Sequence, residues 1–170
     1  MASPHLDAAD KLARWLTRDP HDAEDVLQDA YLRALRFFGG FRGGDGRAWL
    51  LAIVRNTFYT WAEQHGRHKS EVAYDDATLG LHAAEACAHQ GLHGTDPAQL
   101  LLRAADQQLI ESALLELPLE YREILVLREL EELSYKEIAE VVGVPLGTVM
   151  SRLSRARLQL RHQIEAMDQP

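Results

Sequence analysis

The sequence predicts an all-α protein with two small helical domains, a flexible acidic linker between them and a helix-turn-helix near the C-terminus. Apolar residues recur at helical spacing along most of the chain, beginning with Leu6 and Ala9. No segment of useful length alternates apolar and polar residues as a half-buried strand would. We therefore expect helical domains at residues 1–69 and 96–170, joined by residues 70–95.

Three helices are expected in the first domain. The Asp19–Asp22 segment breaks the apolar periodicity after the first helix, and the Asp22 side chain can cap the second. Gly39 and Gly40 end the second helix, and a glycine-rich loop follows. The expected helices span residues 5–17, 22–38 and 47–64.

Aromatic residues and arginines are interleaved in the second half of this domain. Rings beside cations can stack unpaired bases and hold the backbone of a single nucleic-acid strand. The alternative is that most of these rings belong to the core. We favour the core for Phe38 and Trp49, because their spacing follows the inward stripe of their helices.

Four helices are expected in the second domain, which begins at Asp96-Pro97. The first carries an apolar stripe over residues 109–117, and Pro118 restarts the chain. The second carries apolar residues from Tyr121 to Leu130. The last two helices form the helix-turn-helix.

The helix-turn-helix is predicted at residues 134–157. Ser134 and Glu137 can form a capping box at the start of its first helix. Gly143 can adopt the left-handed conformation that a sharp turn requires, and Pro145 suits the first position of the second helix. The alternative is a helical hairpin with an arginine-rich solvated face, which does not require these signals to agree in order and spacing.

The second helix of this motif has two distinct faces. Its inward stripe contains Val149, Leu153, Ala156 and Leu160. Its other face carries serines, Met150 and arginines, and no acidic residue occurs before Glu165. We expect this face to lie against phosphates and base edges in a major groove.

The net charge of −8 argues at first against a nucleic-acid-binding protein, so the distribution of charge has to be considered. Residues 70–117 hold eight acidic residues and one basic residue, whereas basic residues cluster at 47–69 and 152–161. We expect DNA at these two clusters. The acidic segment also contains His82, Cys87, His89 and His93. Their spacing matches no standard zinc site, so we expect neither a metal nor any other cofactor.

Several protein classes are disfavoured. Cys87 is the single cysteine, which precludes an internal disulfide and fits a reducing compartment. The sequence shows no signal-peptide pattern and no apolar run of membrane-spanning length, so we expect a cytoplasmic protein without membrane insertion. We do not expect an enzyme, because there is no nucleophile elbow, phosphate-binding loop or close carboxylate pair with a matched base.

Two blocks of sequence carry a resemblance to a known family. The first block comprises DAEDVLQDAYLRAL at 22–35, FRG at 41–43 and RAWLLAIVRN at 47–56. The second comprises LPLEYREILVLRE at 117–129, LSYKEIA at 133–139 and GTVMSRLSRAR at 147–157. They resemble the second and fourth domains of bacterial RNA polymerase sigma factors of the extracytoplasmic-function (ECF) group, in the sigma-70 family. The resemblance implies a subunit that directs core polymerase to promoters.

The resemblance also assigns surfaces. The clamp helices of the polymerase β′ subunit would be bound by Asp25, Gln28, Asp29 and Leu32. The minus-ten promoter element would be opened and read as a single strand by Phe41, Arg42, Asn56, Tyr59, His65 and Arg67. The minus-thirty-five element would be read as duplex DNA by Thr148, Met150, Ser151, Arg152, Ser154 and Arg155. Met150 is a departure, because the family commonly has Lys or Arg there.

The partners that the resemblance implies are core RNA polymerase, through its β and β′ subunits, promoter DNA and an anti-sigma factor. The main alternative is a transcription regulator that uses the same helix-turn-helix without sigma-type contacts. Its N-terminal half would then be a sensor or dimerisation domain. Binding of core polymerase distinguishes the two functions, since only a sigma factor is expected to bind it.

Overall fold

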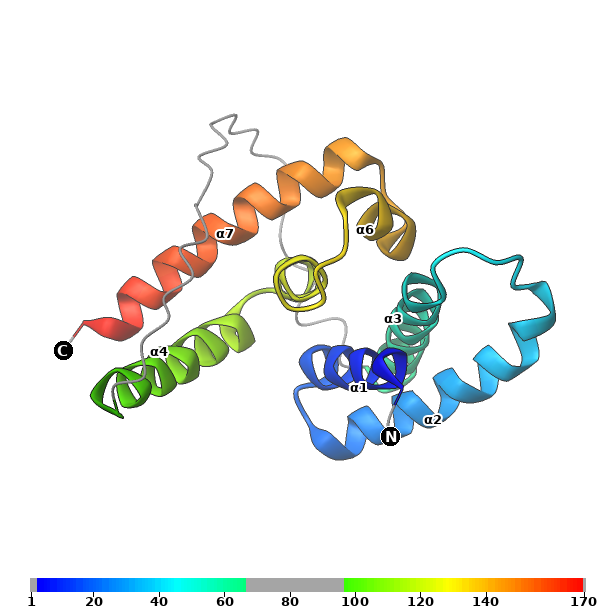
Figure 1. The fold of residues 1–170 in the computed structure, drawn as a ribbon, viewed down its shortest axis with the longest axis horizontal. Helices are drawn as coiled ribbons and strands as arrows, with labels where there is room; N and C mark the ends of the chain where they lie inside the picture. The colour runs from blue at the N-terminus through cyan, green and yellow to red at the C-terminus, as the bar shows by residue number, and fades with distance from the viewer. Residues whose placement is uncertain (1–2, 67–96, 170) are drawn as a thin grey trace.

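The computed structural model describes residues 3–66 and 97–169, which are almost entirely helical and contain no strand (Figure 1). The all-α prediction is confirmed. The helices are α1 Pro4–Thr17, α2 Pro20–Phe37, α3 Gly46–Gln64, α4 Pro97–Glu116, α5 Leu119–Leu125, α6 Tyr135–Val142 and α7 Leu146–Asp168. A 3-10 turn, η1 Phe38–Gly40, follows α2, and a π-helical turn, η3 Val126–Leu130, follows α5. The whole expected linker, residues 70–95 with its histidines and Cys87, lies outside the described residues.

The start of α2 differs from the expectation. Asp19 is the N-cap, and its carboxylate accepts hydrogen bonds from the backbone N–H groups of His21 at 2.8 Å and Asp22 at 3.1 Å. Pro20 takes the first helical position, where its fixed φ and missing N–H are no disadvantage. Asp22 therefore lies inside the first turn instead of capping the helix.

The first three helices pack around a core of small and aliphatic side chains. Helix α1 contacts both α2 and α3, which also contact each other. The buried side chains include Ala9, Leu12, Ala13, Val26, Ala30, Leu51 and Val54. Alanines on α1 and α2 allow the helices to approach closely, so the core of this unit depends on small residues as much as on large ones.

The helix-turn-helix forms as predicted from α6 and α7. Ser134 accepts a hydrogen bond from the Glu137 backbone N–H at 3.1 Å, and the Glu137 carboxylate accepts one from the Ser134 N–H at 3.2 Å. Gly143 has φ 75°, and its N–H donates to the Ala139 carbonyl. Pro145 is the N-cap of α7, one position earlier than expected, because its ψ of 152° is extended.

The N-terminal unit, α1 to α3, and the C-terminal unit, α4 to α7, pack against each other. Helix α6 lies against α3, and α5 lies against α1. The fully buried guanidinium of Arg122 donates to the carbonyl oxygens of Trp15 at 2.8 Å and Leu117 at 2.9 Å. The Trp15 carbonyl is in the last turn of α1, where carbonyls have no partner within the helix. Arg122 therefore satisfies the end of α1 from the other unit.

Candidate nucleic-acid interface

Helix α7 presents a surface away from the core. Val149, Leu153 and Ala156 are buried, and α5 and α6 pack against this helix. The exposed residues among its first nine are Leu146, Gly147, Met150, Ser151 and Ser154. The half-buried ones are Thr148 and Arg152, and Arg155 just beyond is half-buried too. None of the six residues predicted to read the minus-thirty-five element is buried, so the structure brings them together on one accessible helix.

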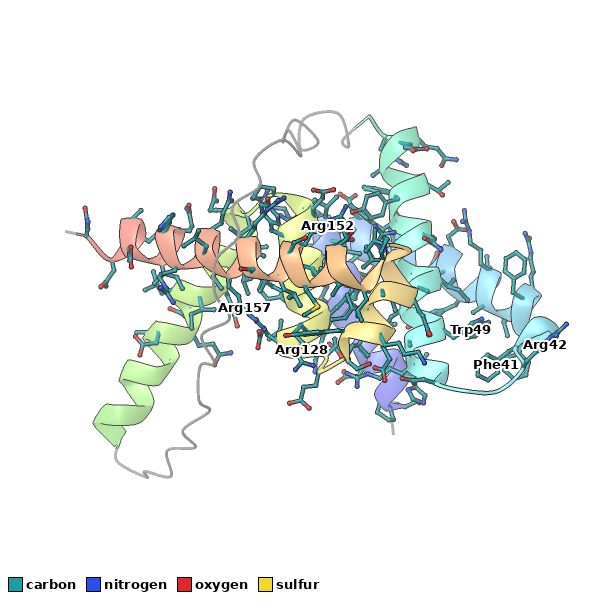
Figure 2. The ribbon with its side chains drawn as sticks, turned by 90° about the horizontal axis from the view of Figure 1, so that it is seen from above. Phe41, Arg42, Trp49, Arg128, Arg152 and Arg157 are labelled. Atoms are coloured by element: carbon teal, nitrogen blue, oxygen red, sulfur yellow. The ribbon has the colours of Figure 1, made fainter. Side chains whose placement is uncertain are left out.

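Two arginines of α7 pair with carboxylates of the same unit. Arg152 lies 3.5 Å from Glu120, and its side chain is only 19% exposed. Arg157 lies 2.9 Å from Glu129. Both arginines project from α7 in Figure 2. To contact a DNA phosphate, the Arg152 guanidinium has to leave Glu120 or be shared with it.

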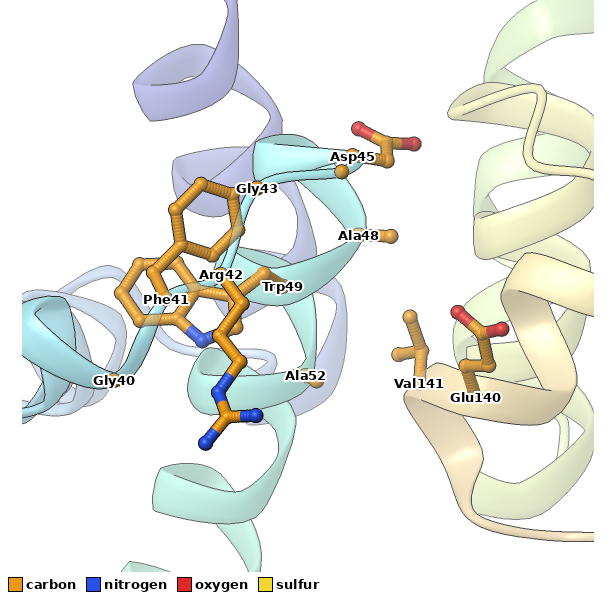
Figure 3. Close-up of a pocket in the computed structure, with 11 residues that line it drawn as sticks. Gly40, Phe41, Arg42, Gly43, Asp45, Ala48, Trp49, Ala52, Glu140 and Val141 are labelled. Atoms are coloured by element: carbon orange, nitrogen blue, oxygen red, sulfur yellow. The ribbon is translucent and has the colours of Figure 1, made fainter.

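A pocket of about 390 Å³ lies between the loop after α2 and helix α6 (Figure 3). Phe41 and Trp49 line one side, with ring centroids 5.0 Å apart, and Arg42 lies beside them. Glu140 and Val141 of α6 face them from the opposite side. An aromatic wall with a nearby cation suits an unstacked base and its phosphate, whereas the Glu140 carboxylate repels a phosphate.

Phe38 is exposed, so its predicted place in the core is wrong. Its side chain is 65% exposed, and its ring lies 6.4 Å from the rings of both Phe41 and Trp49. The C-terminal end of α2 runs beyond α1 and α3 (Figure 1), so the apolar periodicity continues where no helix covers it. Trp49 is half-buried and packs against the core, as expected.

The remaining predicted minus-ten residues are distributed along α3. Asn56 is exposed. The His65 ring stacks on Trp61 with centroids 4.3 Å apart, and its Nδ1 lies 2.7 Å from the Trp61 carbonyl. Tyr59 lies at the junction with the C-terminal unit, where its hydroxyl donates to Glu123 at 3.0 Å. Arg67 lies outside the described residues.

Two ion pairs join α3 to the C-terminal unit. Arg55 donates two hydrogen bonds of 3.0 Å to Glu123, and its guanidinium also lies over the Tyr59 ring at 4.4 Å. Arg47 lies 2.6 Å from the buried carboxylate of Glu131. Neither carboxylate was predicted from the sequence as a junction residue. The available signal was an acidic residue inside an apolar helical stretch, which does not identify a partner on another helix.

Burial shifts the pKa values of the Arg55–Glu123 cluster. Desolvation raises the pKa of Glu123, although the Arg55 charge opposes this. Desolvation lowers the pKa of Arg55, but Glu123 and Tyr59 together raise it by more, so the net shift of this pKa is upward. Desolvation and then the Glu123 charge raise the pKa of Tyr59, so its hydroxyl remains a donor.

The predicted polymerase-binding residues form one exposed face of α2. Asp25, Gln28, Asp29 and Leu32 are all exposed, and Leu32 is 56% exposed. Asp29 pairs with Arg33 at 3.1 Å. Leu35 is 75% exposed and extends the apolar part of this face by one turn.

Other kinds of site are not evident in the part of the chain that the structure describes. There, no group of three or more His, Cys, Asp or Glu side chains could hold a metal ion. None of the helices in residues 3–66 and 97–169 combines the length and apolar character needed to cross a membrane.

Comparison with known protein families gives two matches in chain order. Residues 1–68 match the family described as Sigma-70 region 2, and residues 107–160 match Sigma-70, region 4. The chain is 34% identical over 160 residues to the ECF RNA polymerase sigma factor SigE of Mycolicibacterium smegmatis, covering 92% of this chain and 57% of that protein. It is 34% identical over 158 residues to the RNA polymerase sigma factor YlaC of Bacillus subtilis. That match covers 89% of this chain and 84% of YlaC.

Similar solved structures support the same fold. The sigma factor RpoE, crystallised with the anti-sigma factor NepR from Bartonella quintana, has a TM-score of 0.68 and 28% identity to this chain. That match covers 97% of this chain and 94% of the other. CnrH in complex with the cytosolic domain of CnrY has a TM-score of 0.62 and 24% identity to this chain, and the match covers 97% of this chain and 84% of CnrH. This second match indicates the fold alone.

Proposed function

This chain belongs to the ECF group of RNA polymerase sigma factors, and we propose that it reads promoter DNA through the outer face of α7 and the aromatic pocket beside Phe41. It binds core RNA polymerase and directs initiation at specific promoters. The observation that carries the proposal is that one chain combines a capped helix-turn-helix with a pocket whose aromatic rings belong to the other unit.

Helix α7 is the reader proposed for the minus-thirty-five element. The geometry of a helix-turn-helix places its second helix in the major groove. The six proposed contacts lie in the N-terminal half of α7, which is the part that contacts base edges in such motifs. Thr148, Met150, Ser151, Arg152, Ser154 and Arg155 therefore remain the proposed contacts.

The pocket of Phe41, Arg42 and Trp49 is proposed to hold an unpaired base of the minus-ten element. The two rings offer a stacking wall, and Arg42 is exposed for a backbone phosphate. Asn56 offers an amide for a base edge, and His65 offers a ring that is already stacked on Trp61. Arg67 and Tyr59 complete the proposed minus-ten set.

The exposed face of α2 is proposed to bind the polymerase. Asp25 and Asp29 supply charge at its edge, and Leu32 supplies an apolar anchor that the protein itself does not cover. Charged rims around apolar anchors are usual at protein interfaces. Partners proposed beyond the polymerase are promoter DNA and an anti-sigma factor, which is the kind of protein bound to the similar RpoE structure.

Promoter reading requires the two units to separate at their junction. Glu140 and Val141 of α6 line the pocket that the base would enter, and Glu123 holds the Tyr59 hydroxyl. A DNA strand bound at both places would compete with these contacts of α6 and α5. Binding of polymerase or DNA therefore has to provide more interaction energy in the open arrangement than the junction provides in the closed one.

The test is transcription by core polymerase from a library of templates with randomised promoter segments. We expect transcripts only when this chain is added, and a shared two-part promoter among the templates that are used. Leu32→Asp should weaken co-purification of core polymerase, whereas Leu6→Asp on α1, also at an exposed leucine, should not. Initiation at the same sites by core polymerase alone would refute the proposal. Failure of the full chain to bind core polymerase would favour a helix-turn-helix regulator instead.

A further inference from the structure

The fully exposed residues at the start of α7 carry no charge, whereas Arg152 and Arg155 are half-buried. The exposed residues in its first nine positions are two apolar side chains, a glycine and two serines. Met150 is 53% exposed and Leu146, one helical turn earlier, is 49% exposed. Exposed apolar side chains of this size on a surface helix lack a partner within the protein.

Two of the hydrogen-bonding groups nearby are already engaged. The Ser151 hydroxyl donates to the Thr148 carbonyl at 3.1 Å, and Arg152 is held by Glu120. A guanine is usually selected by an arginine that donates to its O6 and N7 atoms. The part of α7 around Met150 is therefore poorly equipped to select guanine.

An apolar side chain in the major groove can distinguish one base by contact alone, because thymine carries a methyl group at C5. Methionine suits such a contact, since its unbranched and polarisable side chain adapts to the position of the methyl group. We propose that Met150, supported by Leu146, reads a thymine methyl group in the duplex minus-thirty-five element. This inference rests on the proposed function of α7.

The position of Met150 on the helix agrees with this role. Val149 and Leu153 fix the rotation of α7 by their burial, and Met150 and Ser154 follow them directly in the chain on the exposed side. Met150 and Ser154 are one turn apart and therefore lie next to each other on the helix surface. The small Ser154 side chain leaves room for a base edge beside Met150. At the base pair that Met150 contacts, specificity then comes from shape and an apolar contact, with little contribution from charge.

The experiment uses the holoenzyme, formed from core polymerase and the full chain. Duplexes with a randomised minus-thirty-five segment are first selected for binding to the wild-type holoenzyme. Each thymine of the selected sequence is then replaced singly by deoxyuridine, which removes only the methyl group. We expect one such replacement to weaken binding about fourfold, which corresponds to the loss of one buried methyl group. In Met150→Ala holoenzyme the same replacement should have no effect.

Met167→Ala provides a matched control, because Met167 is an exposed methionine at the far end of the same helix. It should retain the full deoxyuridine effect. If a minus-thirty-five sequence is selected but no deoxyuridine replacement weakens binding, or if the effect persists in Met150→Ala, the thymine inference is wrong and the proposed function stands. If no minus-thirty-five preference is selected at all, the proposed role of α7 is wrong as well.

Discussion

Arg55 and Glu123 form a two-point ion pair between α3 and α5, from Nε to Oε2 at 3.0 Å and from Nη2 to Oε1 at 3.0 Å. The Glu123 side chain is 1% exposed and that of Arg55 is 16% exposed. Water therefore does little to screen either charge, and the Tyr59 hydroxyl supplies a further hydrogen bond to the carboxylate. Removing one partner leaves the other charged group buried without compensation.

We expect Arg55→Met to lower the free energy of unfolding by about 3 kcal/mol, because the Glu123 carboxylate loses its counter-charge. Adding Glu123→Gln to Arg55→Met should recover most of this loss, since no uncompensated charge then remains. The measurement is urea unfolding of the full chain at neutral pH. Arg157→Met is the control, because the Arg157–Glu129 pair is 47% and 43% exposed, and it should cost less than about 1 kcal/mol. Equal losses for the two arginine variants would contradict the prediction.

The same carboxylate should make stability depend on pH. Because burial raises the pKa of Glu123 above its ordinary value of 4.5, the folded protein retains this proton to a higher pH than the unfolded chain does. The contribution of Glu123 to stability is therefore complete below pH 4.5 and is lost as the pH rises through the folded pKa. Arg55→Met removes the charge that limits this rise, so its unfolding free energy should fall more steeply with pH than that of the wild type.

The steepest additional slope that one group can give is about 1.4 kcal/mol per pH unit. Urea unfolding of wild type and Arg55→Met at several pH values above 4.5 measures the difference. Glu123→Gln in the Arg55→Met background should abolish the extra slope. If the slope remains in the double variant, a different group titrates.

The sequence predicted those features that depend on neighbours along the chain. The Ser134–Glu137 capping box and the left-handed Gly143 are local signals, and both are present in the structure. Phe38 was predicted wrongly because periodicity shows which side of a helix is apolar but not whether another helix covers that side. Glu123 was missed as a partner of Arg55 because the two residues are 68 positions apart.

The Arg47–Glu131 pair should also hold the units together. Glu131→Lys would place two cations together at a site where the Glu131 side chain is 4% exposed, and the repulsion should destabilise the junction by about 3 kcal/mol. We expect a larger radius of gyration by small-angle X-ray scattering, with unchanged helical content by circular dichroism. Glu132→Lys makes the same charge change at the next, exposed position and should leave the scattering unchanged. An unaltered radius for Glu131→Lys would show that this pair does not hold the units closed.

Two glycines of the helix-turn-helix should respond in opposite ways to alanine. Neither has any atom within 4 Å of an added Cβ, so packing does not decide the result. Gly143→Ala forces a side chain into a left-handed conformation and should cost about 1 kcal/mol of unfolding free energy. Gly147→Ala lies inside α7 and should stabilise the protein by about 0.5 kcal/mol. Thermal unfolding of both variants tests this, and a loss of stability for Gly147→Ala would indicate that α7 is not a regular helix there.

Met150 also provides a test of which side of α7 faces the promoter. Met150→Arg adds a cation to an exposed position on the recognition face, so holoenzyme binding should release about one more counterion from the DNA. The plot of log affinity against log salt concentration should become steeper by about 0.9. Met167→Arg makes the same substitution at the far end of α7 and should leave the slope of the wild type unchanged.

The slopes are measured on one promoter duplex over a salt series. If Met150→Arg and Met167→Arg give the same slope, position 150 does not lie against the DNA. The side of α7 that we assign to the minus-thirty-five element would then have to be changed.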